Sequence, residues 1–272
     1  MSRTIVLKFG GELLEDPTRL QTVVGAVSQI VRSGDPIVIV HGGGKEIDAA
    51  LKVAGIQKHQ VDGLRVTDDP TLDVVVSVLA GAINTRLVAA LNHVGVSAVG
   101  LTGADAGCGL VDPAPLHRTV DGRLVDLGRV GVPSDGADVR VVALLAEMKF
   151  VPAIACIGLG VDGRLFNVNA DTFAGHLAAR LRARRLVIAG TTPGVLDEAG
   201  ATVQSLDPAA VEQLIASKTA TAGMVAKLRA CEHALTQGVG DVVIVDGRDR
   251  AALERAALAA PPPTATRLAR AV

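Results

Sequence analysis

The chain has 272 residues, and its 27 lysines and arginines nearly balance its 28 aspartates and glutamates, for a net charge of −1. This balance argues against a basic nucleic-acid-binding surface. Four phenylalanines with no tyrosine or tryptophan leave little for base-stacking platforms. With 49% apolar and 20% charged residues, the composition is that of a globular protein. We therefore expect no nucleic-acid partner.

The three cysteines, Cys108, Cys156 and Cys231, are far apart and form no CxxC pair, which indicates buried thiols rather than a zinc ribbon or a redox dithiol. The apolar run at residues 5–7 is shorter than the core of a signal peptide, and Lys8 ends it. The longest apolar stretch, residues 74–83, is too short to span a bilayer. These features predict a cytoplasmic protein with no membrane partner.

In chain order, short β-branched runs alternate with longer stretches of helical spacing. The runs predict strands at residues 4–7, 36–40, 97–101, 151–157, 185–189, 241–246 and 264–268. The spacing predicts helices at 20–31, 45–53, 69–93 (one long helix or two), 138–148, 170–183, 208–217, 224–237 and 250–260. Residues 107–134 are rich in Gly, Asp and Pro and predict short antiparallel strands or hairpins. This rhythm predicts an α/β protein whose mainly parallel sheet is covered on both faces.

The glycine-rich segments favour an anion-binding site without a standard nucleotide motif. No Walker A sequence is present, because Glu46 follows the only Gly-Lys step of a glycine run. Residues 158–163 spell GxGxxG, but they read as a hairpin turn rather than the start of a helix. Gly10-Gly11 and the run at 42–44 each follow an apolar strand. They indicate either tight packing or backbone N–H groups that approach an anion.

Four polar positions are candidates for chemistry, each with a simpler alternative. Lys8 either extends to solvent or stands among phosphate-binding glycines. Lys227, near the start of a helix, is uninformative alone. Arg65 lies in a loop before a long helix, as a surface residue or as a bidentate carboxylate clamp. In the Asn-Val-Asn-Ala-Asp segment at 167–171, Asp171 either caps the next helix or joins a set of convergent polar groups.

Six segments in order resemble the acetylglutamate kinases of the amino acid kinase family: KFGG at 8–11, HGGG at 41–44, GLRVT at 63–67, NVNAD at 167–171, PGVL at 193–196 and GMVAK at 223–227. The resemblance implies one domain over residues 1–272 with a three-layer αβα sandwich and an open, mainly parallel central sheet. It also implies that residues 1–165 bind the acyl amino acid and form a dimer, whereas residues 166–272 bind ATP.

The resemblance further implies the reaction and the residues. The chain is expected to phosphorylate the side-chain carboxylate of N-acetyl-L-glutamate with ATP and Mg²⁺, the metal being held mainly by the nucleotide phosphates. The implied catalytic residues are Lys8, Lys227 and Asp171. The implied substrate-binding residues are Gly43, Gly44, Arg65, Asn167 and Asn169. The implied nucleotide-binding residues are Gly10, Gly11, Thr191, Gly194, Leu196, Gly223 and Met224, within stretches 191–196 and 219–227. No protein metal ligands are implied, and His41 is expected to pack behind its loop.

The chain departs from the family pattern at two places. Gly190-Thr191-Thr192 stands where the family usually has Ser or Thr followed by Asp, and Ala104 stands where it often has Lys. Two alternatives stay open: a kinase of the same family that acts on carrier-linked aminoadipate, and a non-catalytic amino-acid sensor. The balanced charge and GLRVT favour the free substrate, and the joint presence of Lys8, Asp171 and Lys227 favours an enzyme.

The expected assembly is a homodimer. In this family, inhibition by arginine is associated with an additional N-terminal helix that links dimers into hexamers. The first predicted strand begins near Thr4, so we expect no such helix and no inhibition by millimolar arginine. The predicted helix at 69–93 is apolar on too many sides for a solvated helix. The side chains expected to need cover are Val74, Val75, Val76, Val78, Leu79, Ile83, Leu87, Val88 and Leu91.

Overall fold

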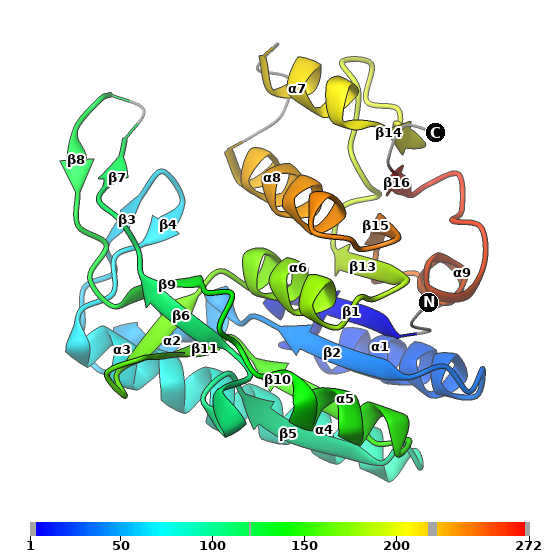
Figure 1. Ribbon diagram of the computed structural model, residues 1–272, viewed down its shortest axis with the longest axis horizontal. Coiled ribbons are helices and arrows are strands. Elements are labelled where there is room, and N and C mark those ends of the chain that lie inside the picture. The colour runs from blue at the N-terminus through cyan, green and yellow to red at the C-terminus, as the bar shows by residue number, and fades with distance from the viewer. Residues whose placement is uncertain (1–3, 120, 217–221, 270–272) are drawn as a thin grey trace.

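The computed structural model describes residues 4–119, 121–216 and 222–269 (Figure 1). Its centre is an eight-stranded sheet in the order β14-β16-β15-β13-β1-β2-β10-β5. All neighbours in this sheet are parallel except β15 and β16. The strands are β1 (Ile5–Phe9), β2 (Ile37–His41), β5 (Ala98–Thr102), β10 (Val151–Ala155), β13 (Arg185–Gly190), β14 (Ser205–Leu206), β15 (Asp241–Asp246) and β16 (Thr266–Leu268).

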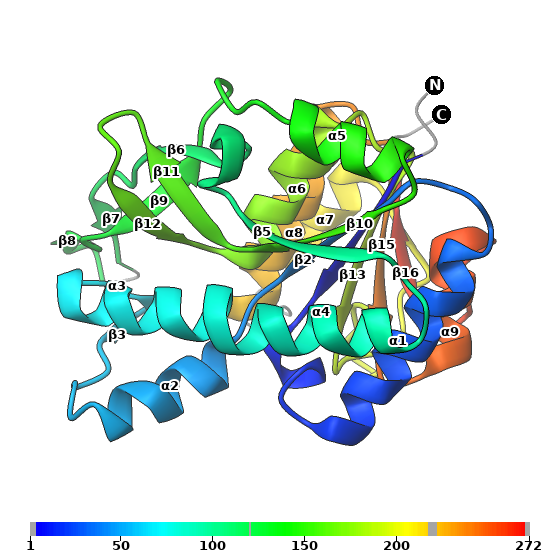
Figure 2. The same ribbon diagram turned by 90° about the horizontal axis from the view of Figure 1, so that it is seen from below.

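Helices cover both faces of this sheet, because successive side chains of each buried strand point to opposite sides. In β1, Ile5, Leu7 and Phe9 face one hydrophobic core, whereas Val6 faces the other. The first core lies under α1 (Pro17–Val31), α4 (Asn84–His93) and α9 (Arg250–Leu258). The second lies under α5 (Arg140–Glu147), α6 (Ala170–Arg180), α7 (Pro208–Ala216) and α8 (Ala222–Thr236). Figure 2 shows α1, α4 and α9 on the opposite side of the sheet from α5 and α6. The predicted αβα sandwich is confirmed.

The segment between β5 and α6 adds short strands beside the sheet. β6 (Leu110–Pro113), β9 (Val130–Pro133), β11 (Ile157–Gly160) and β12 (Leu165–Val168) pair in a closed ring. β11 and β12 form an antiparallel hairpin across the Asp162-Gly163 turn, so the hairpin interpretation of the GxGxxG segment is confirmed. The antiparallel strands expected within 107–134 are also present, as β6 with β9 and as β7 (His117–Arg118) with β8 (Leu124–Val125).

A second small hairpin stands near the β7–β8 hairpin. It consists of β3 (Gln60–Val61) and β4 (Leu64–Arg65), and it follows helix α2 (Gly44–Val53). Asp62 at its tip pairs with His117 of β7 at 2.9 Å, so the two hairpins lie side by side in Figure 1. The expectation that Arg65 lies in a loop was wrong, because it belongs to β4.

The stretch predicted as one helix or two is continuous from Asp69 to His93. It comprises α3 (Asp69–Val76), a π-helical segment η2 (Ser77–Ile83) and α4. By length and composition, Asp69–His93 is the one helix of the described chain that could cross a bilayer, whereas the apolar run at 74–83 within it is shorter than a membrane span. Part of it contacts β5, β10 and α1 within the fold.

The apolar side chains of this helix are covered mostly from within the chain. The buried ones are Val75, Val78, Leu79, Ile83, Leu87 and Leu91. Val74, Val76 and Val88 are partly buried against the same core. The cover that these nine side chains were expected to need is therefore supplied, fully or in part, by the chain's own fold.

The remaining predicted elements agree with the structure to within a few residues. The structure also contains three short strands that were not predicted. Strands of two residues, as β3, β4 and β14 are, leave no periodic pattern. The last residue of the predicted helix at 208–217 lies outside the described residues. All three cysteines are free and buried, as expected.

Candidate active site

The central feature of the site is a buried ion-pair cluster of two lysines and one aspartate. Lys8 Nζ lies 2.7 Å from Asp171 Oδ1, and Lys227 Nζ donates to Asp171 Oδ2 at 3.0 Å. The side chains of Lys8, Asp171 and Lys227 are 9%, 15% and 17% exposed. Three residues that are far apart in the sequence therefore meet at one point.

The local folds explain how this cluster forms. Lys8 follows Val6 by two residues on β1, so it points to the same face of the sheet as Val6, the face covered by α6 and α8. Asn169 caps α6 by accepting hydrogen bonds from the backbone N–H groups of Asp171 and Thr172. Because Asn169 is the cap, the Asp171 carboxylate in the first turn is free to meet the lysines. The alternative that Asp171 itself caps this helix was wrong.

The charges within the cluster shift in different directions. Burial disfavours the ammonium of Lys8, but Asp171 outweighs it and raises the pKa of Lys8. Burial and the charge of Lys8 lower the pKa of Lys227, although Asp171 opposes this shift. Burial opposes ionisation of Asp171, yet the two lysines hold its pKa well below the usual range. One carboxylate cannot neutralise two ammoniums, so the cluster keeps net positive charge and attracts an anion.

Two glycine loops stand beside this cluster because their strands end at the same edge of the sheet. Phe9 of β1 pairs with His41 of β2, which places Gly10-Gly11 next to the loop at 42–44. A side chain on Gly11 would reach within 2.5 Å of the Gly43 Cα, so these loops pack backbone against backbone. A side chain on Gly44 would meet no atom of the described residues within 4 Å. Tight packing therefore explains Gly11, whereas Gly44 faces open space.

The backbone N–H groups of the loops differ in availability. Gly10 donates its N–H to the Ala189 carbonyl at 3.0 Å. Within the described residues, no hydrogen bond uses the N–H groups of Gly11, Gly43 or Gly44, and Gly44 begins α2. Unpaired N–H groups at a helix N-terminus favour an anion.

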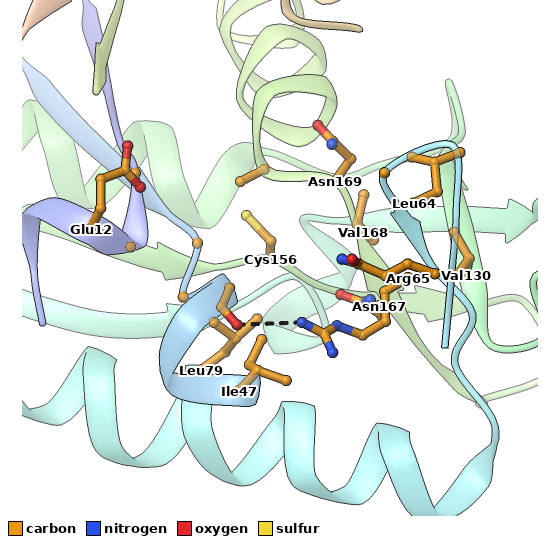
Figure 3. Close-up of a pocket in the computed structure, with 18 of the residues that line it drawn as sticks. Glu12, Ile47, Leu64, Arg65, Leu79, Val130, Cys156, Asn167, Val168 and Asn169 are labelled. Atoms are coloured by element: carbon orange, nitrogen blue, oxygen red, sulfur yellow. Dashed lines mark hydrogen bonds between the residues drawn. The ribbon is translucent and has the colours of Figure 1, made fainter. Parts of the chain in front are cut away.

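A cavity of about 300 Å³ extends from these loops to the β3–β4 hairpin. It is at the small end of the range for ligand pockets. Figure 3 shows Glu12 at one end of this cavity and Arg65 and Asn167 at the other. The predicted site residues that line it are Lys8, Gly10, Gly11, Gly43, Gly44, Arg65, Asn167 and Asn169. The structure therefore brings the predicted substrate-binding residues together with Lys8.

Arg65 is held at its end of the cavity with part of its guanidinium unpaired. Its Nη2 donates to Asp48 Oδ1 and to the Gly44 carbonyl, the latter at 3.3 Å. Its Nη1 is buried and has no hydrogen-bond partner within the described part of the chain. Nearby, Asn167 donates to Thr67 Oγ1 at 3.2 Å. A buried, unpaired guanidinium N–H is suited to a carboxylate.

The predicted nucleotide-binding residues are more scattered. Thr191, Gly194 and Leu196 follow β13, whose end adjoins Gly10. Gly194 has a φ of +79° and packs closely against Thr266 of β16, which gives it a structural role of its own. Gly223 and Met224 begin α8, and residues 219–221 of the predicted stretch lie outside the described residues. None of these five residues lines the cavity beside Lys8.

Sequence reasoning missed two acidic residues of the site. Glu12 lines the cavity, and its carboxylate occupies the space where a side chain on Gly10 would stand. Asp48 holds Arg65 from the middle of α2. An acid four residues after Gly44 on the same helix face was the available signal for Asp48.

His41 lies behind its loop and Cys156 lines the cavity, and the ionisation of each is suppressed by burial. His41 is fully buried, and burial lowers its pKa to about 4, so it is neutral at pH 7. Cys156 lines the cavity and donates to the His41 carbonyl at 3.1 Å, and burial raises the pKa of its thiol. The expectation that His41 packs behind its loop is confirmed.

Comparison with known proteins agrees with this geometry. Residues 3–246 match the amino acid kinase family. An acetylglutamate kinase from Novosphingobium aromaticivorans is 40% identical over 255 residues, which cover 90% of this chain and 84% of the relative. An acetylglutamate kinase from Acidiphilium cryptum is 41% identical over 251 residues, which cover 90% of this chain and 83% of the relative.

Among solved structures, the N-acetylglutamate synthase from Neisseria gonorrhoeae, complexed with coenzyme A and N-acetyl-glutamate, has a TM-score of 0.84 at 23% identity. The match covers 99% of this chain and 60% of that chain. At this identity, the likeness supports the fold alone. The family match and the two relatives extend over nearly the whole chain, and on their evidence the chain belongs to the amino acid kinase family, where its relatives are acetylglutamate kinases.

Proposed function

We propose that the chain is an acetylglutamate kinase. It transfers the γ-phosphoryl group of ATP to the side-chain carboxylate of N-acetyl-L-glutamate and forms N-acetyl-L-glutamyl 5-phosphate, in arginine biosynthesis. The observation that carries the proposal is the Lys8–Asp171–Lys227 cluster beside a cavity that has a buried arginine at its far end.

The two carboxylates of the substrate fit the two ends of the cavity. Arg65 takes the α-carboxylate through its unpaired Nη1, and Asn167 adds a polar contact. The side-chain carboxylate then extends towards Lys8 and the glycine loops. This carboxylate is ionised at pH 7 and needs no general base to become a nucleophile. The residues therefore have to position two anions and offset their repulsion.

Phosphoryl transfer relies on positioning and charge stabilisation, and this chain supplies both. Lys8 and Lys227 stabilise the transferring group, and Asp171 orients both ammoniums. The N–H groups of Gly11, Gly43 and Gly44 donate to its oxygens. The residues assigned to the nucleotide are Gly10, Gly11, Thr191, Gly194, Leu196, Gly223 and Met224.

Mg²⁺ fits this arrangement as a partner of the nucleotide. Within the described residues, no three His, Cys, Asp or Glu side chains converge as a metal site. The phosphates are then its main ligands, and Mg²⁺ neutralises part of their charge when bound. The free N–H groups and the net positive cluster receive the charge that remains.

The proposed organisation follows the order of the sheet. Residues 1–165 supply β1, β2, β5 and β10 and bind the acyl amino acid, whereas residues 166–272 supply β13 to β16 and bind ATP. The proposed assembly is a homodimer through the N-terminal half, in the cytoplasm.

The test is trapping of the acyl phosphate with hydroxylamine. Incubation with ATP, Mg²⁺ and N-acetyl-L-glutamate is expected to give a hydroxamate, and glutamate or aspartate in its place is expected to give far less. Lys227→Ala is the matched control, because it removes one ammonium of the cluster. Absence of hydroxamate above a substrate-free blank would refute the kinase proposal and favour a binding protein on this fold.

A further inference from the structure

Arg65 belongs to a second ion-pair cluster, in which the Asp48 carboxylate binds both Arg65 and Lys58. Asp48 accepts from Arg65 Nη2 through Oδ1 and from Lys58 Nζ at 2.6 Å through Oδ2. Burial acts against ionisation of Asp48, but the hydrogen bonds from Lys58 and Arg65 outweigh it and lower its pKa. The Lys8–Asp171–Lys227 cluster likewise pairs one carboxylate with two cations, so both ends of the cavity combine one acid with two bases.

One of the two cations precedes the β3–β4 hairpin and the other belongs to it. Lys58 precedes β3 and Arg65 belongs to β4, whereas Asp48 belongs to helix α2, which follows the 42–44 loop. The hairpin has little hydrophobic anchorage, since residues 57–60, 62 and 63 are exposed. A two-stranded hairpin is marginally stable by itself. Its attachment to α2 therefore depends on polar contacts.

We propose that Asp48 is a positioning residue that holds the β3–β4 hairpin against α2 and directs Arg65 Nη1 towards the α-carboxylate of the substrate. The inference rests on the proposed function for the identity of the substrate. Asp48 and the Gly44 carbonyl occupy Nη2, and among the residues that the structure describes Nη1 is buried without a hydrogen-bond partner. The Arg65 side chain is only 9% exposed, so the surrounding protein leaves it little room to reorient.

Asp48 both holds the hairpin and contacts Arg65, whereas another residue of the chain holds the hairpin without contacting Arg65 and can serve as a control. Asp62 at the hairpin tip pairs with His117 of β7 at 2.9 Å. This contact also holds the hairpin, but its partner is His117 rather than Arg65. Asp48→Asn and Asp62→Asn thus make the same chemical change at two attachments of one hairpin.

The kinetic test compares these variants with N-acetyl-L-glutamate and with 4-acetamidobutyrate, which lacks the α-carboxylate. Asp48→Asn is expected to raise the KM for N-acetyl-L-glutamate at least about tenfold, as for loss of a charge-assisted hydrogen bond, with the KM for ATP unchanged. Its preference for N-acetyl-L-glutamate over the analogue is expected to fall by a similar factor. Asp62→Asn is expected to keep that preference. Wild-type preference in Asp48→Asn, or an equal rise in the KM for ATP, would overturn the proposal.

A second measurement does not depend on the substrate. In the ligand-free protein, Asp48→Asn is expected to increase backbone hydrogen exchange over residues 58–66 while exchange in β1 stays unchanged. If the wild-type protein fails to phosphorylate N-acetyl-L-glutamate, the proposed function fails, and this measurement still tests the attachment. Should Asp48→Asn not fold, Lys58→Gln removes the other cation, and wild-type exchange at 58–66 in that variant would count against the attachment.

Discussion

Replacing Asp171 by Asn removes one negative charge and almost no volume. The Asn side chain keeps its place in the first turn of α6, because Asn169 and not Asp171 caps that helix. The two ammoniums that lay 2.7 Å and 3.0 Å from the carboxylate oxygens lose their shared counter-ion. Lys8 and Lys227 then repel each other without the carboxylate that both had contacted.

The cost of this change follows from burial. All three side chains are less than one-fifth exposed, so solvent screens their charges only in part. Removing one partner from a buried ion pair typically costs about 3–5 kcal/mol, because the other charge stays buried. Loss of a proton from one lysine relieves this penalty, and burial already favours that loss at Lys227. Since the deprotonated lysine no longer stabilises the phosphoryl group, we expect kcat to fall by about 10²–10³.

The assay is ADP release with saturating ATP and N-acetyl-L-glutamate between pH 6 and 9, together with urea unfolding at each pH. The activity of Asp171→Asn relative to wild type is expected to increase as the pH falls, since the lysine regains its proton. The difference in unfolding free energy between wild type and Asp171→Asn is expected to shrink as the pH rises, because deprotonation of one lysine removes the repulsion between Lys8 and Lys227. A kcat within about threefold of wild type, or a relative activity that does not change with pH, would refute this account.

Three further predictions concern the cavity and the loops. Arg65→Lys keeps a charge but loses the planar fork, so the KM for N-acetyl-L-glutamate is expected to rise about tenfold or more while calorimetric ATP affinity stays constant. Gly11→Ala is expected to lower the melting temperature, because the added methyl group would collide with the backbone of Gly43. Gly44→Ala is expected to leave the melting temperature unchanged and to raise the KM for the acyl substrate. A larger drop in melting temperature for Gly44→Ala than for Gly11→Ala would contradict the packing argument. The folded-state pKa of His41 is about 4 and the unfolded value is 6.5. The unfolded state therefore binds the proton first as pH falls, and stability is expected to decrease by about 3 kcal/mol between pH 6.5 and 4, with a smaller decrease in His41→Leu by urea titration.

Local patterns in the sequence predicted most of the sheet and the place of the glycine loops. β1, β2, β10, β13 and β15 are short apolar runs, and such runs are typical of buried parallel strands whatever surrounds them. The carboxyl ends of parallel strands share one edge of a sheet. For that reason the sequence could also predict that Lys8 and both glycine loops lie together.

The closed ring of β6, β9, β11 and β12 was decided by tertiary structure. Two of its pairings, β6 with β11 and β9 with β12, are parallel and join segments separated by other elements. No turn signal encodes such a pairing, because hairpin signals report only strands that are adjacent in the chain.

The roles of the polar residues divide in the same way. The sequence by itself determined that Asn169 and Asp171 stand where a strand gives way to a helix, and it left two roles open for Asp171, cap of that helix or member of a convergent polar set. The tertiary structure decided between them, because two lysines from β1 and α8 approach Asp171 and leave Asn169 to the backbone. Asp48 gave no strong local signal either, and its role depends on a hairpin that folds back over α2 to bring Arg65 to it. Periodicity reports what a residue does within its own element, whereas the charges of this site act between elements that only the folded chain brings together.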